Sequence, residues 1–384
     1  MPNKNILAED VQAFIEENLN ADLHKLILKK PVFPGITMQE LAAQIHGRRT
    51  AQKKYPFLSR SGILHPAWLS TEQASSEAAA MYKSKIAGSG ELFADLTTGF
   101  GIDAWFISQK FRKAILVEQD GELLCTVAHN WQILGREARF VNTKLEDFID
   151  ETQEDFDLIY LDPARRDKNK KKVFHLEDMY PNILEIQGRL SEISERILIK
   201  LSPLTDLALL KEKIINLAEI HIVALKNDVK EVLALCRKNA ACSDVSVFAA
   251  DLADDTVFSF LMNEEAASQP EYSSPQKYIY LPNNALLKTG AWGAICKKFT
   301  LKKLHPNTQI FTSEELLEEF PGRILEMKTI SPKEIPKGGK FNIISKNYPL
   351  TPDEIRKKYK IKDGGDEYLI FTKTLSGKII LQSV

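Results

Sequence analysis

A glycine-rich turn after an apolar strand is the first segment of this sequence whose residues could do chemistry. The strand predicted at 92–94 leads into Asp95-Leu96-Thr97-Thr98-Gly99-Phe100-Gly101, after which a helix is expected. The two glycines allow a ligand to approach the backbone closely. Glu118 ends the next predicted strand, where a carboxylate can accept hydrogen bonds from two ribose hydroxyls. We therefore predict a nucleotide-like cofactor at this turn.

Two cofactors fit the turn. Gly99-x-Gly101-x-x-Ala104 satisfies the loose dinucleotide fingerprint, and Glu118 stands at about the ~20-residue offset expected of a nicotinamide enzyme. Asp95 favours a different cofactor, because a carboxylate repels a pyrophosphate but attracts the ammonium and sulfonium groups of S-adenosylmethionine. A strand, turn and helix without any ligand are the third interpretation. Asp95 makes S-adenosylmethionine the predicted cofactor.

A second segment with chemical potential is Asp-Leu-Ile-Tyr-Leu-Asp-Pro-Ala-Arg-Arg at 157–166. Asp162 would follow a fourth strand there. Its carboxylate and the Pro163 carbonyl can accept the N–H bonds of an amine and orient the nitrogen lone pair toward a methyl donor. Methylation of uracil C5 would instead need a nucleophilic thiolate, and no cysteine lies near this segment in the sequence. Direct transfer to an amine is therefore favoured.

A run of basic residues follows directly and comprises Arg165, Arg166, Lys168, Lys170, Lys171 and Lys172. Beside a pocket, such a run can hold a phosphodiester backbone. Arg165, Arg166, Lys170 and Lys171 are therefore the predicted substrate-binding residues. The alternative is a solvated surface loop, which is what charge runs commonly form.

The composition is that of an ordinary globular protein. The chain has 384 residues, 44% hydrophobic and 27% charged, which is enough for two or three domains. No apolar run reaches the ~20 residues of a membrane span, and the amino terminus is polar, so we expect a cytoplasmic protein without membrane contact. No metal site or disulfide is expected, because the four cysteines are scattered: Cys125, Cys236, Cys242 and Cys296.

The net charge of −1 conceals an asymmetry. From Pro270 onward there are 19 Lys and Arg against 12 Asp and Glu, a net charge of +7, so the first 269 residues carry −8. A basic tail on an acidic body suggests that the tail meets a polyanion while the body modifies it. A lysine-rich solvated surface is the alternative.

The predicted elements form an α/β domain with a doubly wound parallel sheet. Helices are expected at 102–110 and 121–134, between the first strands. Strands are expected at 92–94, 114–118, 138–141, 156–161, 197–201, 219–225 and 245–249, with an edge strand at 258–262. Asp95, Glu118 and Asp162 then follow three strand ends, where such sheets bind ligands.

The flanking regions have their own patterns. Residues 1–85 read as helical, with a capping box at Ser70-Thr71-Glu72-Gln73. Residues 264–276 read as a linker. Beyond it a small α+β module is expected, whose elements are a strand at 277–282, a helix at 285–299, a helix opened by Thr312, a strand at 341–345, a helix capped by Thr351, a turn at 363–365 and a hairpin at Ser376-Gly377.

Two motifs resemble those of known enzymes. Asp95-x-Thr97-x-Gly99-x-Gly101 resembles motif I of the class I S-adenosylmethionine-dependent methyltransferases. Asp162-Pro163-Ala164-Arg165 resembles the Asp/Asn-Pro-Pro-Tyr motif IV of methyltransferases that modify exocyclic amino groups of bases. Arg165 departs from that motif, since an aromatic residue normally stacks on the base there. We expect Phe174 or Tyr180, which lie nearby in the sequence, to stack on the base instead.

Over nearly the whole chain, the order of parts resembles bacterial class I methyltransferases with a THUMP-like carboxyl-terminal domain. The segments that carry the resemblance are 69–77, 95–104, 162–166, 304–308 and 362–366. The resemblance implies a Rossmann-like core and these parts: a helical segment at 1–85, a methyltransferase domain at 86–265, a ferredoxin-like segment at 277–320 and a THUMP-like domain at 321–384.

The resemblance also implies roles for individual residues. Catalysis falls to Asp162 and Pro163. Cofactor contacts fall to Asp95, Thr97, Gly99, Gly101, Asp103, Glu118, Leu145, Glu146 and Asp162. Leu145 and Glu146 follow strand three, where adenine contacts usually lie, although Lys144 stands near the expected aspartate.

The implied function is S-adenosylmethionine-dependent methylation of an RNA base, in tRNA or rRNA, at an exocyclic amino group such as guanine N2. THUMP domains are associated with RNA, which supports an RNA substrate. Three alternatives stay open at this point: a small-molecule methyltransferase, a nicotinamide-dependent oxidoreductase and a non-catalytic RNA-binding protein. The sequence does not indicate the modified nucleotide or the oligomeric state.

Overall fold

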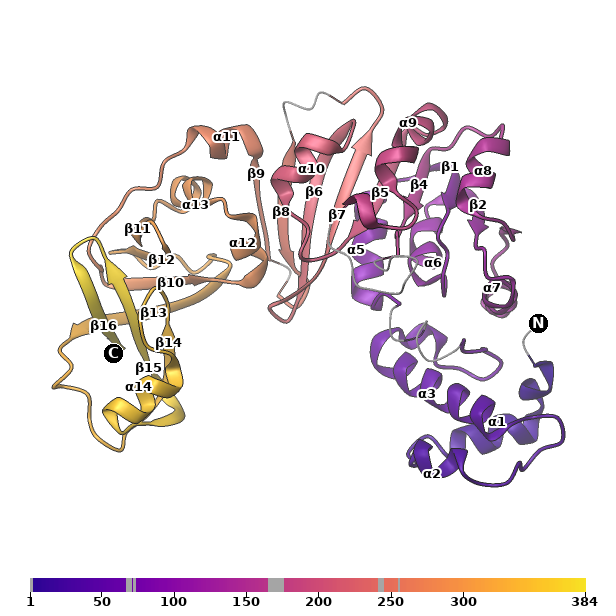
Figure 1. Ribbon diagram of the computed structural model, residues 1–384, viewed down its shortest axis with the longest axis horizontal. Coiled ribbons are helices and arrows are strands. Elements are labelled where there is room, and N and C mark those ends of the chain that lie inside the picture. The colour runs from indigo at the N-terminus through magenta and orange to yellow at the C-terminus, as the bar shows by residue number, and fades with distance from the viewer. Residues whose placement is uncertain (1–2, 67–70, 72–73, 165–175, 241–244, 255) are drawn as a thin grey trace. The chain divides into compact units, whose positions relative to one another are not determined.

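The computed structural model describes residues 3–66, 71, 74–164, 176–240, 245–254 and 256–384. The chain forms two compact units, which Figure 1 shows in a colour gradient from the amino to the carboxyl terminus. The first unit comprises Met1–Ala218 and Val232–Cys242. The second comprises Glu219–Glu231 and Ser243–Val384.

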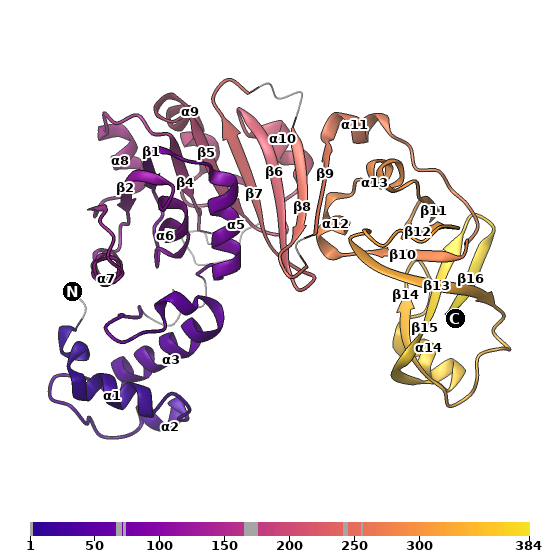
Figure 2. The same ribbon diagram turned by 180° about the vertical axis from the view of Figure 1, so that it is seen from behind.

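The amino-terminal region is helical, as predicted. Its elements, seen together in Figure 2, are η1 (Lys4–Leu7), α1 (Glu9–Glu17), α2 (Leu23–Ile27), α3 (Met38–Lys54) and η2 (Pro56–Leu58). The helices bury a shared apolar core that includes Val11, Ile15 and Leu41. The capping box expected at 70–73 falls largely outside the described residues. The described helix there, α5 (Glu77–Ala87), begins instead after Ser76, whose side chain accepts a hydrogen bond from the Ala79 N–H group.

A mainly parallel sheet with flanking helices forms most of the rest of the first unit (Figure 1). Its parallel strands are β1 (Gly90–Asp95), β2 (Phe111–Val117), β3 (Arg139–Val141), β4 (Leu158–Leu161) and β5 (Arg196–Leu201). They follow the order β3-β2-β1-β4-β5. The described helices are α6 (Ile102–Ser108), α7 (Gly121–Ile133), α8 (Leu145–Glu151), η3 (Leu176–Asp178), α9 (Ile183–Ile193) and α10 (Leu207–Lys213).

The strand order places a ligand site in this sheet. From β1 the chain adds β2 and β3 on one side of the sheet and then β4 and β5 on the other. This switch between β1 and β4 creates a crevice at the carboxyl ends of the strands. The central strands β4 and β5 are buried along almost their whole length, as expected when helices cover both faces of a sheet. The predicted Rossmann-like α/β class is confirmed.

One strand of this sheet was not predicted. β7 (Asp228–Arg237) pairs with β5 in antiparallel fashion, so the expectation of a wholly parallel sheet is wrong. It follows β6 (Leu217–Leu225) after the two-residue turn Lys226-Asn227, in which both residues have positive φ. Residues 231–236 are buried in succession, and the continuous apolar run at 232–236 lacks the alternation that marks a strand in sequence.

The second unit contains two groups of strands. β6 pairs in parallel with β8 (Ser246–Asp251), which pairs in antiparallel fashion with β9 (Thr256–Leu261). A separate seven-stranded sheet has the order β11-β12-β10-β13-β16-β15-β14. Its strands are β10 (Tyr278–Pro282), β11 (Lys302–His305), β12 (Thr308–Ser313), β13 (Gly322–Ile330), β14 (Lys340–Ser345), β15 (Lys362–Thr374) and β16 (Gly377–Ser383). The helices are α11 (Met262–Ala267), α12 (Asn284–Thr289), α13 (Trp292–Phe299) and α14 (Pro352–Tyr359).

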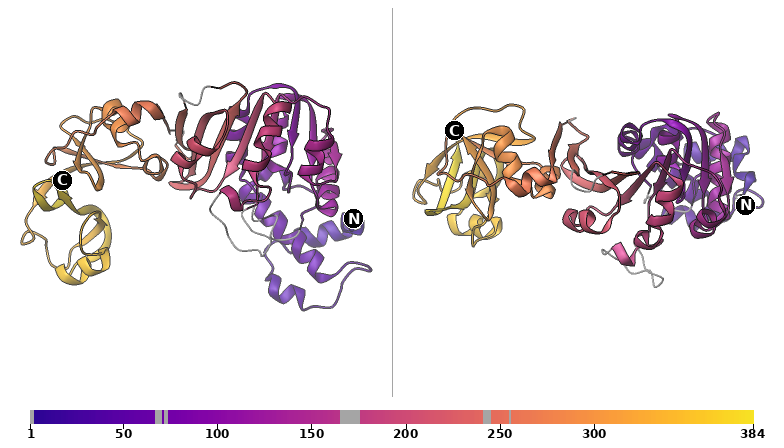
Figure 3. Two further views of the ribbon diagram at one scale, coloured as in Figure 1. Left: turned by 45° about the horizontal axis from the view of Figure 1, so that its top comes forward. Right: turned by 90° about the horizontal axis from the view of Figure 1, so that it is seen from above.

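Several expectations for this unit are confirmed. The strands at 277–282 and 341–345 and the terminal hairpin are present, and Figure 3 shows the yellow terminal strands beside α14. Thr351 and Glu354 form the predicted capping box, because their side chains and backbone N–H groups bond reciprocally.

Other expectations are wrong. Thr312 does not open a helix. It lies in β12, where its hydroxyl accepts from the Gln276 N–H group at 2.8 Å and donates to the Tyr278 carbonyl at 2.9 Å. The linker at 264–276 begins within α11, the helix at 285–299 is two helices, and 363–365 is part of β15.

Gly101 provides a test of the turn geometry. Its φ is +75°, and a Cβ there would lie 2.9 Å from Val127 Cγ1. Gly135 has a similar φ of +78°, and a Cβ there would have no atom within 4 Å. A substitution at Gly135 therefore measures only the free-energy cost of placing an L-residue at positive φ. We predict that Gly135→Ala lowers the unfolding free energy by about 1–2 kcal/mol. Gly101→Ala should cost about 1–3 kcal/mol more, because it also overpacks a buried site.

Urea unfolding of both variants checks this prediction. If both variants lost the same unfolding free energy, contact with Val127 would not constrain the turn.

Candidate active site

A cavity of about 680 Å³ opens at the carboxyl ends of β1, β2, β4 and β5. This size is typical of sites for small molecules and cofactors. Its lining includes most residues that the sequence predicted for the cofactor and acceptor, namely Asp95, Thr97, Gly99, Gly101, Asp103, Glu118, Leu145, Glu146, Asp162 and Pro163. The remaining predicted residues, Arg165, Arg166, Lys170 and Lys171, lie outside the described residues.

Glu118, which follows β2, forms hydrogen bonds that connect the glycine turn to the end of this strand. Its Oε2 accepts a hydrogen bond from the Gly99 N–H group at 2.9 Å, and its Oε1 accepts one from the Asp120 N–H group at 3.0 Å. The Thr98 N–H group also donates to the Val117 carbonyl at 3.1 Å. Each carboxylate oxygen has a second lone pair, so Glu118 can still accept a hydroxyl from a ligand.

Asp95 is a buried acid at the end of β1, with 1% of its surface exposed. Burial is the main reason why the pKa of Asp95 lies well above its ordinary value. The neighbouring carboxylates of Asp103, Asp162 and Glu118 raise it further. A hydrogen bond from the Thr97 N–H group, at 2.9 Å, acts in the opposite direction. A positively charged ligand would therefore favour ionisation of Asp95.

Asp103 has a different environment, because protein groups neutralise it. The Lys83 Nζ atom lies 3.1 Å from Asp103 Oδ1. The hydroxyls of Ser75 and Tyr160 each donate to Oδ2 at 2.7 Å. Burial raises the pKa of Asp103, but the ammonium groups of Lys83 and Lys200, together with the hydrogen bonds from Ser75 and Tyr160, bring it below its ordinary value. Asp103 therefore joins α5, α6 and β4 through a buried ionic network.

Asp162 forms an ion pair with Lys200, whose Nζ atom lies 2.7 Å from Asp162 Oδ2. Lys200 also donates to the Ser75 hydroxyl at 3.3 Å. The Asp162 backbone N–H group donates to Thr97 Oγ1 at 2.6 Å, which connects β4 to the glycine turn. About a third of the Asp162 side chain, 34%, is exposed. This ion pair fixes a carboxylate at the wall of the cavity.

Sequence reasoning missed four members of this network, namely Ser75, Lys83, Tyr160 and Lys200. The sequence contained a clue to Lys200, because it is the one charged residue in the otherwise apolar run Ile197-Leu198-Ile199-Lys200-Leu201. A buried ammonium group requires a partner. The sequence could not identify that partner, because Asp162 lies on another strand, 38 positions away.

Other kinds of site are not evident in the described part of the chain. There, no group of three or more His, Cys, Asp or Glu side chains is arranged to hold a metal ion. None of the described helices is long and apolar enough to cross a membrane.

The Lys83–Asp103 pair yields a stability prediction. The Lys83 side chain is fully buried and that of Asp103 is 9% exposed. Lys83→Met should lower the unfolding free energy by about 3–5 kcal/mol, because it leaves a buried carboxylate with less compensation. The exposed pair of Lys25 and Asp22 is the control, and Lys25→Met should cost less than about 1 kcal/mol.

The pH dependence of the same variant gives a second readout. A lowered native pKa means that Asp103 stabilises the fold above its unfolded pKa, and that this contribution is lost as the pH falls through the native pKa. Lys83→Met should weaken this acid dependence, which urea titrations between neutral and acidic pH would measure. An unchanged dependence would mean that Lys83 does not hold the Asp103 pKa low.

The cavity fits S-adenosylmethionine. When bound, this cofactor supplies a methyl group activated by a sulfonium. Asp95 and Glu118 both line the cavity, where Asp95 would offer a buried carboxylate to the cationic portion of the cofactor and Glu118 would offer lone pairs to its ribose. A Cβ at Gly99 would meet no atom nearer than the Thr97 carbonyl oxygen at 3.9 Å, so a side chain there would occupy cavity space. Leu123 and Leu145 also line the cavity and would give an adenine ring an apolar surface to contact.

Comparison with known proteins supports this fit. Family profiles match a ferredoxin-like domain at 278–321, a THUMP-like domain at 323–382 and conserved hypothetical protein 95 at 82–191. No curated protein matches the sequence. The crystal structure of a proposed methyltransferase from Porphyromonas gingivalis W83 is 30% identical, covers 100% of this chain and 98% of its own, and has a TM-score of 0.85.

More distant structures align with part of the chain. An rRNA methylase from Streptococcus thermophilus is 14% identical over 42% of this chain and 93% of its own, with a TM-score of 0.32. TrmK from M. capricolum, bound to S-adenosyl-homocysteine, is 14% identical over 42% of this chain and 68% of its own, with a TM-score of 0.33. The full-length likeness, together with the ferredoxin-like and THUMP-like matches, shows that this chain belongs to the bacterial class I S-adenosylmethionine-dependent methyltransferases with a THUMP-like carboxyl-terminal domain.

Proposed function

We propose that this methyltransferase acts on RNA and methylates an exocyclic amino group of a base, with guanine N2 as the acceptor. The observation that carries the proposal is the Asp162 carboxylate, held on Lys200 at 2.7 Å beside Pro163 in the wall of the cofactor cavity. A fixed carboxylate of this kind suits an acceptor that presents N–H groups.

Asp162 and Pro163 would act by positioning the acceptor. Lys200 engages one carboxylate oxygen, and the other oxygen can accept an N–H bond of the amine, with the Pro163 carbonyl as a second acceptor. This arrangement directs the nitrogen lone pair toward the cofactor side of the cavity. Correct alignment of two reactants can contribute roughly 7–11 kcal/mol to catalysis, so no covalent intermediate with the protein is required.

The charge of Asp162 favours guanine over adenine. Guanine presents the N1–H and N2–H donors side by side, so the free oxygen of the carboxylate can accept from this edge without facing another acceptor. Adenine presents its amino donor beside the N1 acceptor, which a carboxylate repels. An aspartate in this position therefore supports guanine N2 as the acceptor.

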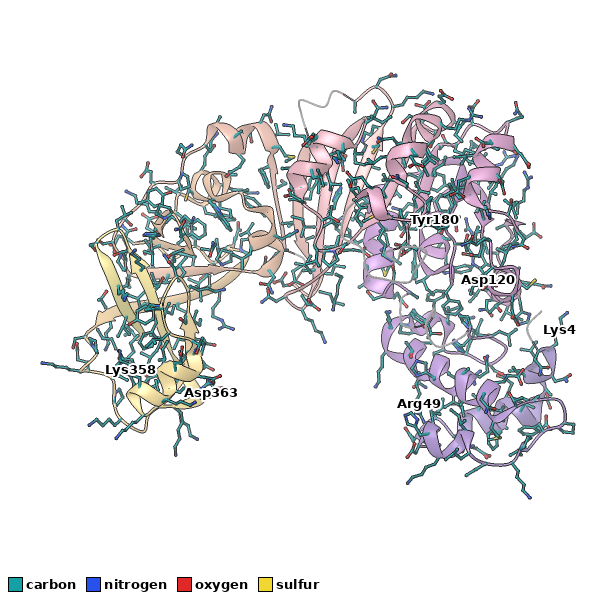
Figure 4. All side chains as sticks on the ribbon, viewed as in Figure 1. Lys4, Arg49, Asp120, Tyr180, Lys358 and Asp363 are labelled. Atoms are coloured by element: carbon teal, nitrogen blue, oxygen red, sulfur yellow. The ribbon has the colours of Figure 1, made fainter. Side chains whose placement is uncertain are left out.

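The carboxyl-terminal region supports an RNA substrate. Residues 323–382 match THUMP-like domains, and THUMP domains are associated with RNA. The chain from Pro270 onward carries a net charge of +7. Six lysines of this region are exposed and able to contact phosphates, among them Lys358, which Figure 4 labels on α14: Lys357, Lys358, Lys360, Lys362, Lys373 and Lys378.

A labelling experiment tests the substrate. The protein is incubated with methyl-labelled S-adenosylmethionine and total RNA from cells that lack the protein. We expect label in RNA and, after digestion to nucleosides, in N2-methylguanosine. Label confined to small molecules would contradict the proposal, as would labelled RNA with the methyl group at a ring carbon.

Asp162 can be tested directly. Asp162→Ala should abolish methyl transfer while leaving the affinity for S-adenosylmethionine within about tenfold, or ~1.4 kcal/mol, of the parent. Asp150→Asn, which alters an exposed acid outside the cavity, is the control and should retain activity. Turnover rates and calorimetric cofactor affinities provide the comparison. Unchanged turnover in Asp162→Ala would remove Asp162 from the mechanism.

Asp95 should make cofactor affinity depend on pH. The pKa of Asp95 is raised, and a cationic ligand lowers it again by favouring the ionised form, so protons and the ligand compete for this carboxylate. Affinity should therefore rise with pH, and binding should release a proton. Asp95→Asn should weaken binding by at least about tenfold and remove this proton release.

Calorimetry in two buffers of different ionisation enthalpy measures the released proton. The Asn variant is the control for titration of the cofactor's own amino group. Equal proton release by parent and variant would exclude Asp95 as the linked group.

A further inference from the structure

Two large apolar side chains in the described part of the cavity wall are unusually exposed. Tyr180 is 38% exposed and Leu204 is 64% exposed, and both line the same cavity as Asp162. Figure 4 labels Tyr180 on the α/β portion of the first unit. Exposed apolar surface at the wall of a cavity is suited to contact with an apolar ligand surface.

Tyr180 is fixed to the strand end that carries Asp162. The Ala164 N–H group donates to the Tyr180 carbonyl at 2.7 Å, and the Tyr180 N–H group donates to the Ala164 carbonyl at 3.1 Å. These two bonds form an antiparallel bridge. The bridge holds the aromatic ring close to Asp162-Pro163-Ala164, although the chain reaches Tyr180 only after a further segment.

Leu204 is fixed to the end of β5, which also carries Lys200. The Leu204 N–H group donates to the Ser202 hydroxyl at 3.2 Å, and the Thr205 N–H group donates to the Ser202 carbonyl at 3.0 Å. These bonds define a tight turn. The Lys200–Asp162 ion pair then joins the ends of β4 and β5, so the turn with Leu204 and the bridge with Tyr180 belong to one connected framework.

We propose that Tyr180 and Leu204 form the acceptor subsite, in which a flat purine ring stacks on Tyr180 and contacts Leu204 while its amino group reaches Asp162. This inference rests on the proposed function and names the residues that would bind the base. A planar ring fits best, because it matches the phenol ring in shape and presents N–H donors at its edge to the carboxylate. An aliphatic acceptor would gain little from stacking.

Tyr180 variants test the subsite in steady-state methyl transfer to hypomethylated cellular RNA. Tyr180→Ala should raise KM or lower kcat/KM for RNA by about ten- to a hundredfold, the range expected for loss of one base–aromatic stack. Tyr180→Phe keeps the ring and should remain within about threefold of the parent. Tyr272→Ala is the matched control, because Tyr272 is also 38% exposed but lies outside the cavity.

Leu204 is tested in the same assay. Leu204→Ala should weaken kcat/KM by a smaller factor, about three- to tenfold, since it removes an apolar contact without a stack. Leu28→Ala, which truncates an exposed leucine outside the cavity, is its control. Circular dichroism melting curves establish that each variant is folded.

A binding measurement separates this inference from the proposed function. Saturation-transfer NMR with guanosine as the probe, in the presence of the full-length protein, should show contact with the base protons. This contact should persist in Tyr180→Phe and Tyr272→Ala and disappear in Tyr180→Ala. Loss of guanosine contact in Tyr180→Ala would support the subsite even if the RNA assay failed.

Two results would overturn the subsite. One is guanosine binding that is equal in the parent and Tyr180→Ala, and the other is RNA methylation with an unchanged KM and kcat in Tyr180→Ala. Either result would leave the methyltransferase activity itself untouched.

Discussion

The pairing of carboxylates with buried ammonium groups at the carboxyl edge of the sheet is the interaction on which this site depends. Charges removed from water are strongly unfavourable unless an opposite charge and hydrogen bonds compensate them. Lys200 meets this requirement for Asp162, and Lys83 meets it for Asp103. Because the partners come from different helices and strands, the same contacts that neutralise the acids also hold the wall of the cavity together.

Two acids at this edge show how partners change chemistry. Asp103 has ammonium groups beside it, and its pKa is lowered. Asp95 is equally buried but has other carboxylates as its charged neighbours, and its pKa is raised. The first acid is already compensated by the protein, whereas the second gains most from a cationic ligand. Asp103 is therefore part of a structural network, whereas Asp95 is suited to contact a positively charged cofactor.

The cavity combines this acidic side with an apolar side that is suited to a ring. Asp162 stands between them, held by Lys200, and the exposed side chains of Tyr180 and Leu204 line the same space. In the proposed reaction the protein forms no covalent bond to the substrate. Its contribution is the fixed geometry of two binding surfaces, and the ion pairs of the buried lysines Lys83 and Lys200 supply that rigidity.

The sequence by itself determined the features that depend on neighbouring residues. The glycine turn, the acids after strands one, two and four, the amino-terminal helices and the Thr351 cap were all predictable, because turns, caps and periodic apolar faces are set by residues close together in the chain. The same local signals led to the predicted cofactor, through Asp95 and the two glycines.

Only the tertiary structure decided the contacts between distant segments. The Lys200–Asp162 and Lys83–Asp103 pairs and the bridge from Ala164 to Tyr180 join residues that are separated in sequence. Thr312 has a side chain typical of a helix cap, but it lies in β12 and pairs with β10. β7 was not predicted because its residues 232–236 are buried in succession and do not alternate between apolar and polar. Such outcomes depend on which groups must be paired or buried once the chain is compact, and local residue preferences do not contain that information.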